Sequence, residues 1–330
     1  MQSNLQLAPN TLLAYARGLE DYIYFCTRNG IGIEEATREH ISLWVKELAS
    51  REDTRPNRSR RQRDVLKLGQ PPGLSNATIQ QRLTAIRLFY DYLVDTGVRA
   101  KNPVGRGRWR GARTQVDDHN QRLLLRRRGL PWIPTEEQWD RILAAVRTES
   151  LRNRLMFALQ YDCALRRQEL CLLETGDFDF AHRTLRIRPE TTKSQRERVV
   201  VYSEVTGRLF KAYLTHRFAI TRERGRLFLS ESPRNFSAPL SYSTWSKVTR
   251  DIAVRSGVEN FSTHTLRHLR LTDLARSGWE LHWISKFAGH KSPETTMLYI
   301  HLSGRKFSKA FERSMGAIHD WRISTLKGIT

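Results

Sequence analysis

A basic stretch from about Val98 to Gly129 most constrains the fold, because it separates two segments that have regular apolar patterns. It is rich in arginine, has only Asp117 and Asp118 as acidic residues, and contains glycines that would keep part of the backbone flexible. A chain of 330 residues is long enough for two domains with separate hydrophobic cores. We therefore expect two domains joined by a basic linker.

The formal net charge of +22 predicts a polyanionic partner, most often a nucleic acid. A solubility or membrane-surface effect is the alternative, but a folded chain rarely carries so large an excess of one sign without use. The segment 98–129 is either a solvated linker or a linker lying along a phosphate backbone, and its charge density favours the backbone contact. Arginines also crowd together at 51–70. The arginines expected to bind DNA are Arg58, Arg60, Arg61, Arg106, Arg108, Arg110, Arg113, Arg126, Arg127 and Arg128.

The cysteines favour a reducing compartment. Cys26, Cys163 and Cys171 are an odd number without a close pair, which argues against a disulfide framework or a zinc site. The N-terminus lacks the pattern of a signal peptide, and no apolar run is long enough to span a bilayer. We expect a soluble, cytoplasmic protein that needs no membrane.

Helical spacing of apolar residues predicts three helices in the first hundred positions. The first ends at Gly30, the second covers residues 41–48, and the third, capped by Ser75 or Asn76, ends at Gly97. This half of the chain is predicted to be all-helical.

The second half mixes helices with a few short strands. Thr135 begins a helix, and another is centred on residues 155–159. Three β-type segments follow, the last two joined as a hairpin, and the remainder is again helical. The expected fold is mainly α with a small antiparallel β-sheet (α+β). The β-type segments are 177–180, 184–189 and 197–203.

Five short pieces carry the chemistry, and their order matters more than any one of them. Alone, each is weak, because arginines on helices are mostly solvated and tyrosines on helices mostly pack. In chain order they are ALRRQEL at 164–170, TKSQRER at 192–198, HTLRH at 264–268, GH at 289–290, and Tyr299.

This ordered set resembles the Arg…Lys…His-x-x-Arg…His…Tyr pattern of the tyrosine recombinase, or phage integrase, family. Ala164 stands where the family has glycine, and glycines are missing beside Lys193. The resemblance extends to residues 75–103, which are similar to the last helix of the family's core-binding domain. The catalytic residues that it implies are Arg166, Lys193, His264, Arg267, His290 and Tyr299, with Glu169 and His268 in support.

The resemblance also implies an organisation. It comprises a helical, SAM-like core-binding domain at 1–105, a basic linker at 106–130, a catalytic domain at 131–315 and a tail at 316–330. Four protomers would bind two specific sites on double-stranded DNA and exchange strands through a Holliday junction. Accessory DNA-bending proteins are further partners that it allows. No cofactor and no metal ion are expected.

The C-terminal segment after Tyr299, which includes the tail, carries apolar residues at helical spacing that either dock on a neighbouring protomer or pack on their own domain. These residues are Phe307, Phe311, Met315, Ile318 and Trp321.

Elementary chemistry leads to the same site. Phosphoryl transfer needs charge stabilisation, an in-line nucleophile and a proton donor for the leaving oxygen. Arg166 and Arg267 would form a forked phosphate clamp, and His264 shares a helix face with Arg267. A tyrosine is a poor nucleophile at its ordinary pKa of ~10, so nearby cations are needed to favour the Tyr299 phenolate.

The remaining groups have narrower expected roles. Lys193, on the hairpin, would protonate the departing 5′ oxygen. Glu169 either orients a neighbouring basic group such as Arg166 or is a carboxylate on a helix surface. His268 is expected to pack or to support the catalytic groups.

Two other functions remain open. A type IB topoisomerase uses a similar catalytic set, and a DNA-binding architectural protein could keep the fold without activity. Integration, transposition and dimer resolution are not separated by the sequence. The basic segments lean towards the integrase or transposase of a mobile element.

Overall fold

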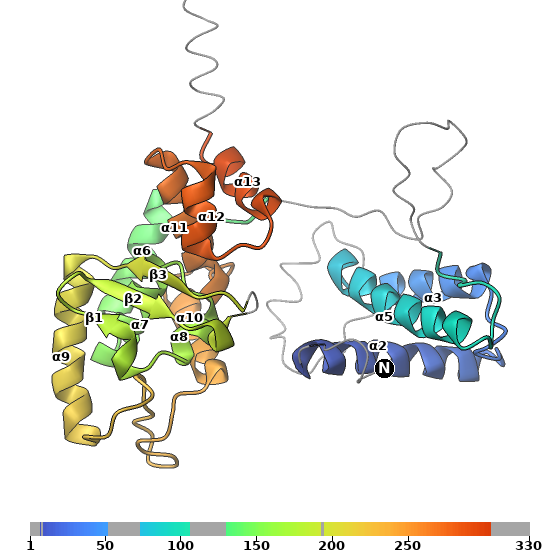
Figure 1. Ribbon diagram of the computed structural model, residues 1–330, viewed down its shortest axis with the longest axis horizontal. Coiled ribbons are helices and arrows are strands. Elements are labelled where there is room, and N and C mark those ends of the chain that lie inside the picture. Colours follow the sequence, from blue (N-terminus) through green and yellow to red (C-terminus); the bar gives the residue numbers. More distant parts are fainter. Residues whose placement is uncertain (1–6, 8, 52–72, 106–129, 193–194, 305–330) are drawn as a thin grey trace, which may run out of the picture. The chain divides into compact units, whose positions relative to one another are not determined.

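The computed structural model describes residues 7, 9–51, 73–105, 130–192 and 195–304. The chain divides into two compact units, Met1–Gly129 and Leu130–Thr330. Figure 1 draws the described parts of the first in blue and cyan and those of the second from green to red. Among the described residues, no helix is both long and apolar enough to cross a membrane.

The first unit contains three described helices whose apolar faces meet in one core. The Ser75 hydroxyl caps the last of them by accepting from the backbone N–H of Thr78. Tyr22 and Tyr90 are fully buried and share a hydrogen bond of 2.8 Å between their hydroxyls. The helices are α2 (Pro9–Arg28), α3 (Arg38–Ser50) and α5 (Asn76–Asp95).

The start of the predicted basic stretch belongs to this unit. Arg99 donates to the carbonyl oxygen of Ala36 at 2.9 Å and lies over the ring of Tyr90. Asn102 donates to the carbonyl oxygen of Arg87 at 3.0 Å. These contacts tie residues 98–105 to α5, so Arg99 has a structural role.

The second unit is mainly helical around one large core. Its first helix begins with a capping box between Thr135 and Gln138, as the sequence predicts. The helices are α6 (Glu136–Arg147), α7 (Leu151–Asp162), α8 (Arg167–Cys171), α9 (Glu204–Ile220), α10 (Tyr242–Arg255), α11 (Thr263–Arg276), α12 (Leu281–Ala288) and α13 (Pro293–Leu302), with 3-10 turns η2 (Thr175–Asp177) and η3 (Pro189–Thr191).

A three-stranded antiparallel sheet lies in this unit in the order β1-β2-β3. Leu185 of β2 pairs with Val200 of β3, and Ile187 pairs with Arg198, so these four side chains point to the buried face. The predicted mainly α fold with a small antiparallel sheet is confirmed. The strands are β1 (Phe178–Asp179), β2 (Thr184–Ile187) and β3 (Arg198–Val201).

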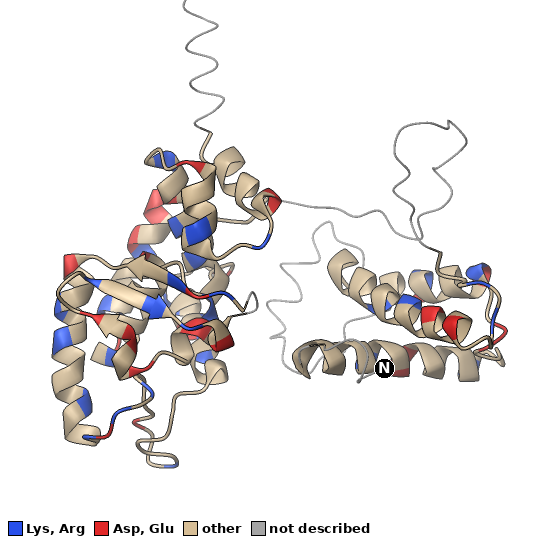
Figure 2. Cartoon of the chain, viewed as in Figure 1, with Lys and Arg blue, Asp and Glu red and all other residues tan. Residues whose placement is uncertain are grey.

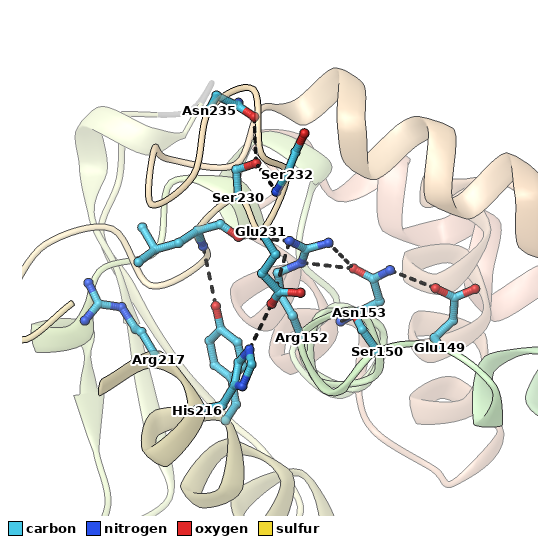
Figure 3. Close-up of polar contacts among 12 residues, drawn as sticks. Glu149, Ser150, Arg152, Asn153, His216, Arg217, Ser230, Glu231, Ser232 and Asn235 are labelled. Carbon is cyan, nitrogen blue, oxygen red and sulfur yellow. Dashed lines mark hydrogen bonds and ion pairs between the residues drawn. The ribbon is translucent and has the colours of Figure 1, made fainter. Parts of the chain in front are cut away.

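A polar network fixes the long connection between α9 and α10 (Figure 3). Arg152 of α7 donates to the carbonyl oxygen of Leu229 at 2.9 Å. His216 of α9 contacts Glu231 at 3.2 Å, and the buried Arg217 donates to the carbonyl oxygen of Leu227. The connection is therefore anchored to α7 and to α9.

Charge of both signs is spread over the second unit. Figure 2 shows Lys and Arg on α9 and α12, with acidic residues interspersed through the unit. Both predicted basic segments, 51–70 and 98–129, lie largely outside the described residues.

Candidate active site

Glu169 organises the arginines at the start of α8. It is 1% exposed and accepts from the Arg166 guanidinium at 2.7 Å and from Arg198 of β3 at 2.7 Å. It also accepts from the backbone N–H of Arg166 at 2.9 Å. Burial opposes its ionisation, but the hydrogen bonds and charge of Arg198, with the charges of Arg166 and Arg267, lower the pKa of Glu169 to about 2.

Arg267 lies on α11 with its guanidinium buried between two other segments. It donates to the carbonyl oxygen of Ala164 at 2.5 Å and to that of Ala288 at 2.6 Å. Burial and the charge of Arg166 lower the pKa of Arg267 to about 9. The group remains cationic at neutral pH, and it pins the ends of α7 and α12 to α11.

His290 follows a sharp turn at the end of α12. Gly289 has φ of +64°, a left-handed conformation that favours glycine, and its carbonyl oxygen accepts from Arg166 at 3.2 Å. Nδ1 of His290 is 2.8 Å from the hydroxyl of Thr296 on α13. Burial and the charges of Arg267, Arg166 and Arg198 lower the pKa of His290 to about 3, so the ring is neutral near pH 7.

Tyr299 lies on α13, which Ser292 caps and Pro293 begins. The side chain is 2% exposed, its hydroxyl is 2.9 Å from Nδ1 of His268, and its ring stacks on His290 at 5.9 Å between centroids. Burial raises the pKa of Tyr299, while the charges of Arg267 and Arg166 oppose that rise.

The two histidines of α11 lie one turn apart on the same helix face. His264 is exposed, and its ring centroid is 6.4 Å from that of His268. Burial lowers the pKa of His268 to about 4, and the charges of His264 and Arg267 act in the same direction. His268 is therefore the ring of this pair that contacts the phenol.

The structure brings together most of the catalytic and supporting residues predicted from sequence. His264 lies at the exposed edge of this group. Lys193 and the ten arginines predicted to bind DNA lie outside the described residues. The clustered residues are Arg166, Glu169, Arg267, His268, His290 and Tyr299.

Sequence reasoning missed Arg198. Its guanidinium donates to the carbonyl oxygen of Phe287 at 3.0 Å and forms the ion pair with Glu169. A signal was present in the strand pattern, because Arg198 and Val200 are two residues apart and so share the buried face of β3. A buried arginine on that face requires an acidic partner.

This arrangement combines a phenol with several cations. Arg166 and Arg267 can bind the non-bridging oxygens of a phosphodiester, and the neutral rings of His268 and His290 flank the phenol. Among the described residues, no group of three or more His, Cys, Asp or Glu side chains could hold a metal ion.

Comparisons with known proteins agree with this fold. The family model described as the phage integrase family matches residues 134–305, and the model of the phage integrase N-terminal SAM-like domain matches residues 1–97. The chain belongs to the phage integrase family, the tyrosine recombinases, and is an enzyme of the site-specific recombinase and integrase class.

Individual relatives match over most of their length. Tyrosine recombinase XerD of Caulobacter vibrioides is 27% identical over 90% of this chain and 87% of its own. Transposase A from transposon Tn554 of Staphylococcus aureus is 24% identical over 94% of this chain and 87% of its own. A structure of XerH site-specific recombinase bound to its palindromic difH substrate has a TM-score of 0.66 at 17% identity, covering 91% and 78% of the two chains.

Proposed function

We propose that this chain cleaves and rejoins DNA through a 3′-phosphotyrosine bond formed by Tyr299. The observation that carries the proposal is the convergence, around one phenol, of groups from positions 166 to 290. Arg166, Arg267 and His290 would hold the scissile phosphate, with exposed His264 closing the site from α11. Because the intermediate keeps the phosphoester bond energy, rejoining needs no ATP.

Lys193 completes the proposed reaction as the acid that protonates the departing 5′ oxygen. It follows η3 on the connection between β2 and β3, whose pairing is that of a hairpin. The donor would then come from a different segment than those that hold the phosphate.

We assign residues 1–105 to DNA binding, 106–130 to a basic linker and 131–315 to catalysis. Both units would contact duplex DNA, and the arginines of the linker would neutralise phosphates. Relatives described as a transposase and as recombinases support action on specific DNA sites. We propose further that four protomers bind two such sites and exchange strands through a Holliday junction. The transposase relative, with the high basic charge, favours a role in a mobile element.

The tail at 316–330 would join neighbouring protomers. A groove of about 1020 Å³ lies between β3 and α12 and has apolar side chains along its walls. Val199 and Trp283 in this groove are 59% and 53% exposed, which favours cover by an apolar segment such as the tail of a second copy. Deleting residues 305–330 should abolish tetramers on DNA, as read by mass photometry, while leaving binding of one protomer intact.

The chemistry is tested with nicked suicide substrates taken from DNA that flanks the gene. The wild-type chain should yield a covalent phosphotyrosyl adduct, and Tyr299→Phe should not. An adduct followed by exchange between two specific sites supports a recombinase, whereas relaxation of supercoils alone points to a topoisomerase-like enzyme. DNA binding without any adduct from the wild-type chain would assign an architectural role.

A further inference from the structure

The phenol of Tyr299 already has a partner that can take its proton. Nδ1 of His268 lies 2.9 Å from the phenolic oxygen, within hydrogen-bonding distance. Both side chains come from packed helices, α11 and α13, and Tyr299 is 2% exposed. Because water has little access to the buried side chain, a protein group is favoured as the acceptor of the phenol proton.

The neighbouring imidazoles are less well placed for this step. His290 stacks on the Tyr299 ring with an angle of 9° between the planes, and its Nδ1 contacts the Thr296 hydroxyl at 2.8 Å. Nδ1 of His290 is therefore engaged by Thr296, whereas Nδ1 of His268 contacts the phenolic oxygen. His264 is exposed, one helical turn from His268.

We propose that His268 is a catalytic residue: it accepts the phenol proton of Tyr299 during cleavage and returns it during rejoining. The inference rests on the proposed covalent reaction. As the O–H bond breaks, a bond forms between the proton and Nδ1, the phenolic oxygen bonds to phosphorus, and the P–O5′ bond breaks. The departing 5′ oxygen takes its proton from Lys193, and the reverse sequence restores every group.

The charges around His268 explain when it would act. His264 and Arg267 on its own helix disfavour the protonated ring, as does burial, while Tyr299 of α13 lies against Nδ1 and His290 lies across the phenol ring. The ring is thus neutral before DNA binds and available as an acceptor. A phosphodiester placed at Arg166 and Arg267 adds negative charge, which favours the imidazolium that forms as the proton moves.

The first test compares single-turnover cleavage by His268→Asn and by the wild-type chain. Asparagine can keep a hydrogen bond to the phenol but cannot take its proton, so cleavage should slow by ~10²-fold. A substrate with sulfur in place of the 5′ bridging oxygen needs no acid, so it should rescue Lys193→Ala but not His268→Asn. Equal rates for His268→Asn and wild type would overturn the proposal and leave His268 a positioning residue.

A second test leaves His268 in place and so does not depend on the folding of a variant. The cleavage rate should increase with pH as His268 loses its proton. Replacing Tyr299 by the more acidic 3-fluorotyrosine should not shift this rising limb of the pH–rate profile. A limb that shifts to lower pH with the acidity of the phenol would mean that the phenol loses its proton to water, and His268 would not be the acceptor. Absence of any adduct from the wild-type chain would instead refute the proposed function itself.

Discussion

Glu169 shows how one buried carboxylate holds several parts of the site. It accepts hydrogen bonds from Arg166 and Arg198, which come from the start of α8 and from β3. Arg198 could not be buried there alone, because an unpaired charge in the interior is costly. The carboxylate therefore sets the position of a guanidinium that the proposed reaction needs.

Replacing Glu169 by glutamine should destabilise the fold by ~3 kcal/mol, because Arg198 would remain buried without a counter-charge. Urea denaturation at pH 7 measures the difference. Glu197→Gln is the matched control, since the Glu197–Arg186 pair is exposed and its loss should leave the midpoint unchanged. Equal midpoints for both variants would contradict the role of Glu169.

The same carboxylate predicts an acid dependence. Its folded-state pKa is about 2 against an ordinary 4.5, so its contribution is full above pH 4.5 and is lost as pH falls towards 2. The advantage of the wild-type chain over Glu169→Gln in unfolding free energy should therefore shrink across that range. Urea titrations at successive pH values measure it, and a constant advantage would show that ionisation of Glu169 is not its source.

Thr296 is the residue that orients His290. Its hydroxyl is fully buried and lies 2.8 Å from Nδ1 of the ring. Thr296→Val keeps the shape and removes the contact, so cleavage should fall by ~10- to 100-fold with little change in DNA affinity. Thr296→Ser should keep the activity, and equal cleavage by the serine and valine variants would show that the hydroxyl does not matter.

At the scale of elements, the turn between α7 and α8 carries backbone strain. Ala164 has φ of +48°, a conformation that suits glycine, and the sequence comparison had already marked this position as a departure from the family's glycine. The strained turn places the carbonyl oxygen of Ala164 against the guanidinium of Arg267. The strain is thus located where the turn contributes to the site.

Relieving that strain should stabilise the protein. Ala164→Gly removes a cost of ~1–2 kcal/mol and adds an entropic cost of ~0.5–1 kcal/mol, so a net gain of about 0.5 kcal/mol is expected. Thermal unfolding measures it. Ala158→Gly, within the regular helix α7, should instead destabilise by ~1 kcal/mol. Destabilisation by both changes would argue against strain at Ala164.

Local signals predicted the elements better than they predicted the contacts between them. Caps at Ser75 and Thr135 and the pattern of Pro293 after Ser292 depend on neighbouring residues, so the helices could be placed from sequence. The contact between His268 and Tyr299 joins residues 31 apart and depends on how α11 packs against α13. No periodicity encodes such packing.

The site shows the same division. The types and order of its residues were readable as a pattern, and so was the contact of Glu169 with Arg166, although a surface carboxylate was an open alternative. The second partner of Glu169, Arg198, was not predicted. Arg198 escaped notice because a charged residue in a strand is ordinarily read as solvent-facing.

At the scale of the whole molecule, each unit has its own buried core. A fragment that starts at Leu130 should therefore unfold cooperatively by itself, as measured by circular dichroism on heating. Its affinity for DNA should fall less steeply with salt than that of the full chain. In a plot of the logarithm of the binding constant against the logarithm of the salt concentration, each phosphate that the missing arginines neutralise contributes ~0.9 to the magnitude of the slope. Equal slopes in anisotropy titrations would place those arginines off the DNA.

The buried guanidinium of Arg267 has a consequence for genetics. It joins three segments through the carbonyl oxygens of Ala164 and Ala288, so an allele that loses it weakens the protein as well as the reaction. The protein made from such an allele would be degraded by cellular proteases, so the allele would be recessive. If the chain acts as the proposed tetramer, a variant that lacks only the Tyr299 hydroxyl would persist, occupy DNA sites and inactivate mixed assemblies, which is dominant behaviour.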